Sequence, residues 1–193
     1  MIRKIALLLS ALALPALAAE YSIEPAHSAA QFSVRHLMVS NVKGEFKKLS
    51  GKVVYDEANP AATVVEATLD VSTINTGEPA RDKHLKSADF FDLDKYPTMS
   101  FVSTSARQTS QGIDVSGNLT IHGVTKAVVL HVSDISKEIK DPMGLLRRGA
   151  TATTVVNRHD FGMVWNKNLD GGGVVVGEEV NITIDIEVVR KPA

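Results

Sequence analysis

The sequence predicts an all-β domain whose antiparallel strands form either a sandwich or a closed barrel, accompanied by one short helix. Apolar and polar residues alternate with a period of two over most of the chain, which is typical of half-buried strands. Many connections between these stretches are of hairpin length, and strands do not alternate with helices, which favours antiparallel pairing. Since no second helical layer is available to cover a sheet, the apolar faces must meet one another.

The first residues have the features of a cleavable export signal. Arg3 and Lys4 form a basic start, and an apolar run of about ten residues leads to an Ala-x-Ala ending at Ala18. The run is too short to span a bilayer, which requires about twenty apolar residues. We therefore expect a signal peptide over residues 1–19, cut after Ala18 or the next alanine. A periplasmic location and a single domain over residues 20–193 follow.

The composition excludes several classes of function. The chain has 193 residues, of which 44% are hydrophobic, and it contains no cysteine. In an oxidising compartment this excludes disulfides, thiolate metal sites and cysteine nucleophiles, so the core itself must stabilise the fold. Removal of Arg3 and Lys4 leaves 19 basic residues against 22 acidic ones, a net charge of about −3. This balance argues against nucleic acid as a partner.

About eight strands are expected along the mature chain. They cover residues 28–35, 42–47 with a continuation at 53–55, 65–71, 99–110, 113–121, 124–132, 147–156 and 180–188. The last is the clearest, because its apolar residues alternate strictly with polar ones; they are Val180, Ile182, Ile184, Ile186 and Val188. Gly117 inside a strand predicts a bulge or bend. A barrel of eight strands is just wide enough to hold one small or slender ligand.

One stretch has helical spacing instead. Pro79 suits the first turn of a helix, where its missing N–H is not needed. Asp82 and Lys86 are four residues apart, so we expect them to form an ion pair on one face, with Leu85 on the apolar side. Pro97 prevents further extension. The sequence predicts a helix of about two turns that covers part of the strand layer.

No arrangement of residues typical of catalysis or metal binding stands out. The six histidines include no His-x-His or His-x-x-x-His pair, and no Gly-x-Ser-x-Gly elbow occurs. The three glycines at 171–173 do not join a strand to a helix, as they would in a phosphate-binding loop. We therefore expect no catalytic residue, no metal and no cofactor.

What remains is the apolar interior. Its inward-facing residues are compatible with a filled core, because small barrels usually fill themselves with side chains. A binding interior is favoured by two candidate covers for a barrel mouth. One is the helix with the adjacent Phe90 and Phe91, and the other is the glycine-rich segment beside Trp165.

Three motifs, well separated along the chain, occur together. The first is Arg-Asp-x-His-Leu-x-Ser-x-Asp-Phe-Phe-Asp over residues 81–92, followed by Tyr-Pro. The second is Gly-Asn-Leu-Thr-Ile-His-Gly-Val-Thr-Lys over residues 117–126, and the third is Arg-x-Asp-Phe-Gly over residues 158–162. With the His-Ser pair at 27–28 and Phe-Ser-Val-Arg-His-Leu at 32–37, they resemble the YceI family of exported, lipocalin-like proteins. The resemblance covers the whole mature chain.

The resemblance implies an eight-stranded antiparallel, lipocalin-like β-barrel with the helix near its mouth and without catalytic activity. It also implies a long isoprenoid in the lumen, either a polyprenyl chain or an isoprenoid quinone, held for storage or transport. Carried to this sequence, the lumen would be lined by Phe32, Val34, Phe46, Leu69, Phe101, Leu119 and Ile184. Toward the entrance would lie His36, Leu85, Phe90, Phe91 and Trp165. The alternative is that several of these side chains only pack the helix onto the barrel.

A polar headgroup would remain at the rim. The basic residues expected there are Arg35, Arg81, Lys83 and Arg158. Two other functions stay open: an accessory protein that presents a quinone to a membrane redox partner, and a ligand-free structural stress protein with a filled core. A transient contact with the inner membrane and a homodimer are the remaining expectations about partners.

Overall fold

The computed structural model describes residues 18–192, so almost all of the expected signal peptide lies outside the described residues. The strands are β1 (Ala19–Ile23), β2 (Ala29–His36), β3 (Ser40–Phe46), β4 (Leu49–Tyr55), β5 (Val64–Asp70), β6 (Thr98–Gln108), β7 (Ile113–Ile121), β8 (Val124–Ser133), β9 (Ile139–Lys140), β10 (Leu146–Asn157) and β11 (Val176–Arg190). The helical elements are α1 (Pro79–Leu85) and the 3₁₀ turns η1 (Pro25–His27), η2 (Pro60–Ala62), η3 (Val71–Thr73) and η4 (Arg158–Phe161).

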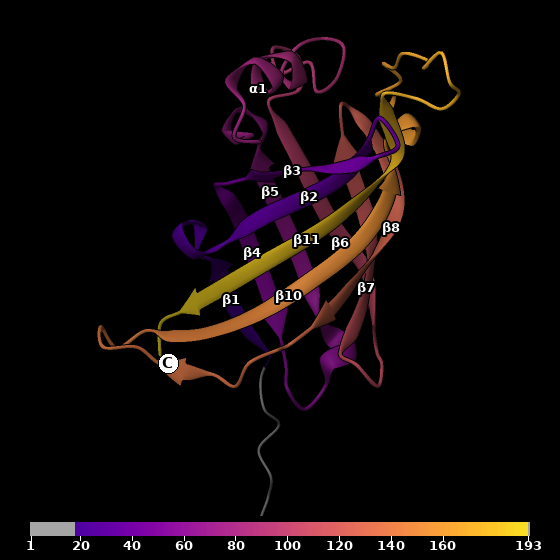
Figure 1. Ribbon diagram of the computed structural model, residues 1–193. Helices are drawn as coiled ribbons and strands as arrows, with labels where there is room; N and C mark the ends of the chain where they lie inside the picture. Colours follow the sequence, from indigo (N-terminus) through magenta and orange to yellow (C-terminus); the bar gives the residue numbers. More distant parts are fainter. Residues whose placement is uncertain (1–17, 193) are drawn as a thin grey trace, which may run out of the picture.

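Eight of the strands close into a barrel. Around the ring the order is β11, β1, β4, β5, β6, β7, β8 and β10, and the pairing of β10 with β11 completes it. Each of these pairings is antiparallel. Figure 1 shows β10 and β11 running obliquely across the front, as strands must when a sheet closes on itself. The predicted eight-stranded antiparallel barrel with one helix is confirmed, and the sandwich is excluded.

The individual strands differ in part from the prediction. The ring contains β1, which is not among the predicted strands, although Tyr21 and Ile23 alternate with the polar Glu20 and Ser22. The expected first strand is β2, which continues the line of β1 along the same edge of β11 and forms a hairpin with β3. The stretch expected as one strand with a continuation is two strands, β3 and β4, separated by a turn.

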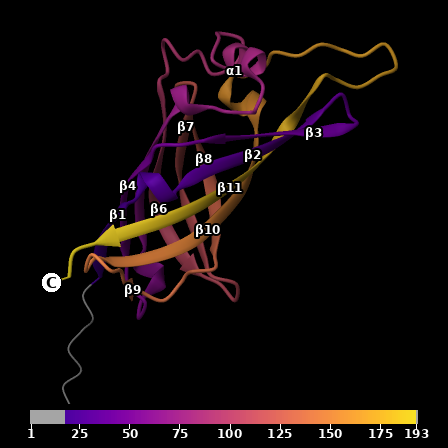
Figure 2. The same cartoon turned by 60° about the vertical axis from the view of Figure 1, so that its left-hand side comes forward.

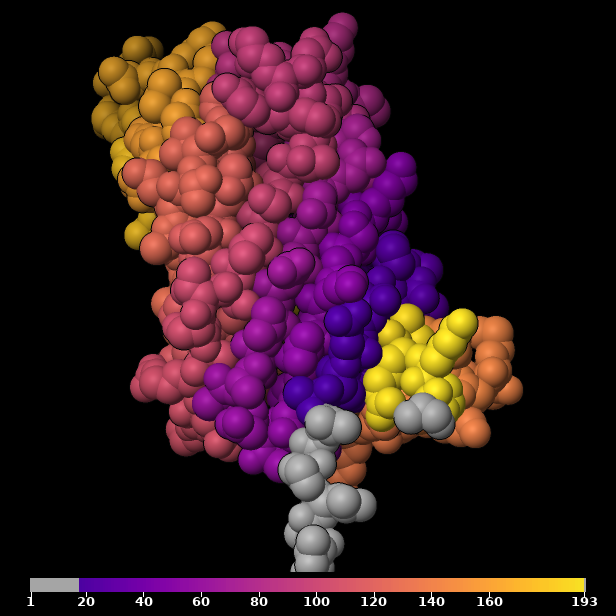
Figure 3. All heavy atoms as spheres, turned by 180° about the vertical axis from the view of Figure 1, so that it is seen from behind, coloured from indigo at the N-terminus to yellow at the C-terminus, as the bar shows by residue number. Residues whose placement is uncertain are grey.

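The longest pairing in the barrel joins β10 and β11. Twelve residue pairs follow one another without a register shift, from Leu146 with Arg190 to Asn157 with Glu179. At about 3.4 Å per residue this is about 40 Å of continuous wall. The barrel is therefore elongated, as its rear face in Figure 3 shows, with α1 and the segment 164–176 at one end and the end of β11 at the other.

Helix α1 lies over one end of the barrel (Figure 1). Its seven residues make the predicted two turns, and Pro79 occupies the first of them as expected. The Glu78 side chain caps the helix by accepting a hydrogen bond from the backbone N–H of Ala80 at 3.2 Å.

The expected ion pair between Asp82 and Lys86 is wrong. Asp82 Oδ1 instead accepts hydrogen bonds from the backbone N–H and the hydroxyl of Thr76. Arg81 donates to the Thr76 hydroxyl and carbonyl oxygens at 2.8 and 3.0 Å. The side chains of Asp82 and Arg81 therefore fix the turn that precedes the helix, because Thr76 offers them hydrogen-bond partners within reach.

Candidate ligand-binding cavity

A cavity of about 270 Å³ extends along the inside of the barrel. Its wall is almost entirely carbon, and residues from every strand of the ring contribute to it. The volume lies just below the usual range for small-molecule sites, about 300–1,000 Å³. The inward row predicted for the last strand is confirmed, since the wall includes Val180, Ile182, Ile184, Ile186 and Val188.

The residues expected in the lumen all lie on the cavity wall. They are Phe32, Val34, Phe46, Leu69, Phe101, Leu119 and Ile184. They come from β2, β3, β5, β6, β7 and β11, and the period of two turns each of them inward. Their contact with a ligand stays a prediction.

Two glycines make room for aromatic rings in this wall. A Cβ at Gly44 would lie 2.5 Å from Cζ of Phe32, and one at Gly117 would lie 2.4 Å from Cζ of Phe101. Real Cβ atoms do not approach other atoms so closely, so each ring depends on its glycine. The bend predicted at Gly117 is present on the neighbouring strand, where the register of β6 against β7 shifts between Ser103 and Ser105.

Aromatic side chains cover the α1 end of the cavity. Leu85, Phe90 and Phe91 lie on the cavity wall, whereas Trp165 packs on the outside against Phe90, with ring centroids 5.3 Å apart. The Trp165 ring also meets the ring of His84 edge to face at 5.0 Å. The two expected covers are thus in contact with each other, and their contacts are between rings rather than ion pairs.

The remaining entrance residue and three of the basic candidates lie off the cavity wall. His36 ends β2 and pairs with Val176 of β11. The Arg35 guanidinium donates to the Met38 carbonyl oxygen at 2.8 Å, Arg81 holds the turn before α1, and Lys83 is exposed on the helix. Their contact with a headgroup stays a prediction.

Arg158 is the one basic candidate on the cavity wall, and only 3% of it is exposed. It donates to three backbone carbonyl oxygens: from Nε to Gly177 at 2.9 Å, and from its terminal nitrogens to Met163 at 2.5 Å and Val176 at 3.3 Å. Burial lowers the pKa of its guanidinium, and the charge of Glu178 only partly opposes this effect. Arg158 therefore ties both ends of the segment 163–177 to the barrel.

The opposite end of the barrel is closed by polar groups that sequence reasoning missed. The Tyr21 hydroxyl donates to Glu138 at 2.5 Å, and Arg190 donates twice to the same carboxylate at 2.9 and 3.0 Å. Arg148, which lines the cavity, donates to the Tyr21 hydroxyl at 3.2 Å and to Glu57 at 2.7 Å. Burial alone would raise the pKa of Glu138, but the hydrogen bonds from Arg190 and Tyr21 outweigh it and the pKa is lowered.

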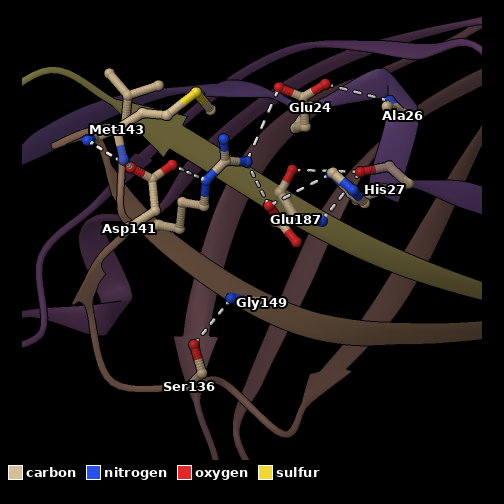
Figure 4. A network of polar contacts seen from close by, with 11 residues as sticks. Glu24, Ala26, His27, Ser136, Asp141, Met143, Gly149 and Glu187 are labelled. Carbon is tan, nitrogen blue, oxygen red and sulfur yellow. Dashed lines mark hydrogen bonds and ion pairs between the residues drawn. The ribbon is translucent and has the colours of Figure 1, made fainter.

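A second group of ion pairs holds the outer side of this end. Asp141, Glu24 and Glu187 gather around the guanidinium of Arg147, with Asp141 at 2.6 Å and Glu187 at 2.5 Å (Figure 4). The hydrogen bond from the Gly149 N–H to Ser136 Oγ in the same view fixes the segment that crosses the barrel end. One end of the cavity is therefore closed by apolar contacts and the other by charge-assisted hydrogen bonds.

Within residues 18–192, no group of three or more His, Cys, Asp or Glu side chains is placed to hold a metal ion. No helix in the same part of the chain is long and apolar enough to cross a membrane. The expected absence of catalysis, metal and cofactor stays a prediction.

A closed antiparallel barrel around an elongated apolar cavity defines a protein that can enclose a slender apolar molecule. Residues 21–188 match the family model of the YceI-like domain, so the chain belongs to the YceI family. It is 38% identical over 178 residues to Protein YceI of Escherichia coli, covering 91% of this chain and 90% of that protein. The family predicted from the three motifs is thereby confirmed.

Solved structures share the fold. BcnA of Burkholderia cenocepacia superposes with a TM-score of 0.73 at 23% identity, covering 86% of this chain and 98% of that one. A polyisoprenoid binding domain from Saccharophagus degradans, implicated in plant cell wall breakdown, superposes with a TM-score of 0.64 at 17% identity, covering 89% of this chain and 98% of that one. At these identities the two likenesses establish the architecture.

Proposed function

We propose that the protein is exported to the periplasm and holds one long isoprenoid, a polyprenyl chain or an isoprenoid quinone, in its barrel for storage or transport. The observation that carries this proposal is the apolar cavity, which reaches from the aromatic cover beside α1 to Arg148 at the other end. An elongated carbon-lined space favours a slender apolar chain over a compact polar molecule.

The energetics agree with such a ligand. Each buried CH₂ contributes about 0.8 kcal/mol, so each five-carbon unit of an isoprenoid contributes roughly 4 kcal/mol before ordering costs. Since affinities saturate near about −18 to −21 kcal/mol, ordering and desolvation must cancel much of the sum for a long chain. The name of the Saccharophagus degradans neighbour, a polyisoprenoid binding domain, supports the same ligand class.

The proposal includes no chemical step. In the part of the chain that the structure describes, the charged side chains on the cavity wall are Arg148 and Arg158, and each is held by structural partners at one end of the cavity. No nucleophile and base lie paired along the apolar wall between them. The protein would therefore bind and release its ligand unchanged.

The test is to purify the exported protein without detergent, extract it with organic solvent and analyse the extract by mass spectrometry. A stoichiometric isoprenoid would support the proposal, and its headgroup would tell whether a quinone is presented to a redox partner. An empty extract, together with failure to take up added polyprenyl lipid, would overturn the proposal and leave a structural protein with a filled core.

A matched pair of variants on β10 sharpens this test. Ala150 lies on the cavity wall, whereas Thr153 is exposed on the outer face of the same strand. Ala150→Phe should fill part of the lumen and lower the amount of bound isoprenoid several-fold, because the ring occupies the space of the chain. Thr153→Phe adds the same ring outside and should leave the bound amount unchanged. Equal ligand content in both variants would contradict binding in the lumen.

A further inference from the structure

The tip of the β2–β3 hairpin exposes three consecutive apolar residues. Leu37, Met38 and Val39 are 38%, 50% and 74% exposed. We refer to these three residues as the apolar tip. Single apolar residues on a surface are common, but a contiguous group at the end of a projecting element is typical of an interaction site. Figure 2 shows this hairpin and the segment 164–176 extending away from the barrel together.

The backbone of the apolar tip is strained as well. A hydrogen bond from the Val39 N–H to the His36 carbonyl oxygen closes the turn at 3.0 Å, and its central residues, Leu37 and Met38, have φ values of 49° and 61°. Positive φ at both central positions favours Asn and Gly, and bulky residues adopt it at a cost. The chain therefore places large apolar side chains where neither solvent nor backbone favours them, which points to a function.

The surroundings hold the apolar tip in this exposed position. Arg35 donates to the Met38 carbonyl oxygen, and the Leu37 N–H donates to the Val175 carbonyl oxygen at 2.9 Å. Gly173 leaves space for the Met38 side chain, since a Cβ there would lie 3.0 Å from Met38 Cγ. The tip is thus braced by a neighbouring segment and does not depend on flexibility to face outward.

The apolar tip lies near the α1 end of the cavity. His36, which precedes the tip, pairs with Val176, and Val34 and Val176 both line the cavity. The segment that braces the tip also carries Trp165, which covers the α1 end. A surface that met the apolar tip would therefore lie close to the aromatic cover of the lumen.

The two segments that form and brace the tip carry more basic than acidic residues, and Glu178 and Glu179 follow shortly after the second one. The segments 35–43 and 164–176 together contain three basic residues, Arg35, Lys43 and Lys167, and one acidic residue, Asp170. The complete chain carries a formal net charge of −1. Apolar side chains with basic residues on the same segments match an anionic bilayer surface, where the apolar side chains enter the interface and the basic ones stay among the headgroups.

We propose that Leu37, Met38 and Val39 insert into the surface of an anionic lipid bilayer and dock the barrel there, with the cover of its lumen facing the lipid, while ligand is exchanged. This inference rests on the proposed function for the nature of the exchanged ligand. The docking itself depends only on the apolar tip and its basic neighbours, and can be tested without any ligand.

The test compares the wild-type protein with the variant Leu37→Asn, Met38→Gly, Val39→Thr by co-sedimentation with vesicles of phosphatidylethanolamine and phosphatidylglycerol. Asn-Gly suits the positive φ values, so this variant should be at least as resistant to urea as the wild type. We expect its bound fraction to fall about tenfold or more, because each inserted side chain contributes to partitioning. Vesicles of phosphatidylcholine alone should bind the wild type more weakly.

Ile139 and Met143 provide the matched control. They are 61% and 77% exposed at the opposite end of the barrel. The variant Ile139→Ser, Met143→Ser removes comparable exposed apolar surface, and should bind vesicles as the wild type does. A loss of binding in this control equal to that of the tip variant would overturn the proposal, because binding would then reflect general surface hydrophobicity.

Two further outcomes separate this inference from the proposed function. If the wild-type protein contains an isoprenoid but does not sediment with anionic vesicles, docking by the tip is wrong and the proposed function stands. If the protein sediments through its tip but neither contains nor takes up isoprenoid, docking stands and the proposed function fails.

If the apolar tip instead joins two copies of the chain, sedimentation velocity will show a dimer that the tip variant abolishes, and the bilayer proposal is overturned.

Discussion

Replacing Gly44 by alanine tests how the lumen is shaped. The added Cβ would lie 2.5 and 2.7 Å from Cζ and Cε1 of Phe32 and 2.8 Å from Cγ2 of Thr76. Overpacking of this kind costs about 1–3 kcal/mol, and the reduced freedom of the unfolded chain returns about 0.4–1 kcal/mol. We expect Gly44→Ala to lower the free energy of unfolding by about 1–2 kcal/mol, or the melting temperature by roughly 2–8 °C for a chain of this length.

Urea unfolding of four proteins isolates the cause: wild type, Gly44→Ala, Phe32→Leu, and the double variant. Phe32→Leu alone should destabilise, because it removes part of a ring that packs against Phe46 with centroids 5.7 Å apart. If the clash with the ring is the reason for the loss at Gly44, the double variant should be more stable than the sum of the single effects predicts, by about 1 kcal/mol. Additive effects would refute the reasoning.

Gly149 provides the control for the effect of adding a methyl group to a strand glycine. A Cβ there would have the Ile186 carbonyl oxygen as its nearest neighbour, at 3.7 Å, which is ordinary van der Waals contact. Gly149→Ala should therefore leave stability unchanged or raise it slightly. A comparable loss at Gly149 and Gly44 would show that the methyl group is disfavoured in strands of this barrel generally, and not by the Phe32 ring.

Two further predictions concern charged groups at the ends of the barrel. Arg158→Met should lower the free energy of unfolding by about 3 kcal/mol or more, measured in urea, because it leaves carbonyl oxygens buried without their donor at about 1–3 kcal/mol each; a change within about 0.5 kcal/mol would contradict this role. Glu138 has a lowered pKa in the fold, so its contribution to stability is present above its ordinary pKa of 4.5 and is lost as pH falls through the lower folded value. The stability difference between wild type and Glu138→Gln should therefore shrink between about pH 7 and pH 3, and a difference independent of pH would contradict the assignment.

The cavity wall could be predicted from the sequence because the alternation of apolar and polar residues along one strand is a local pattern. In β11 the alternation of isoleucine and valine with polar residues indicates which side of the strand faces inward, and this pattern can be interpreted without any distant residue. The polar closure could not be predicted in this way. Tyr21 and Glu138 are 117 positions apart and Glu138 and Arg190 are 52 positions apart, so only the closed barrel brings them together.

The same reasoning explains which basic candidate lies on the cavity wall. Arg158 stands out in the sequence only as part of a motif, while its burial depends on carbonyl oxygens of the segment 163–177. Arg35, four residues before Val39, has the positive charge expected of a residue that contacts a headgroup. Its guanidinium instead donates a hydrogen bond to the backbone of the β2–β3 hairpin. Charge in a sequence does not indicate whether a side chain serves the fold or faces a ligand.

The two ends of the barrel differ in the kind of contact that closes them, and from this difference we predict where a ligand would enter. At one end, several charge-assisted hydrogen bonds between Arg190, Glu138 and Tyr21 must be broken together, although the side chains of Arg190 and Glu138 are 26% and 22% exposed. At the other end, the rings of Phe90 and Trp165 are held by apolar packing beside a helix of seven residues, and helices this short are marginal without tertiary contacts. An apolar ligand that reached this end could replace the packing contacts with its own, so opening there costs less than at the polar closure. The α1 end is therefore the entrance that the physics of the two closures favours, and it is also the end near which the apolar tip projects.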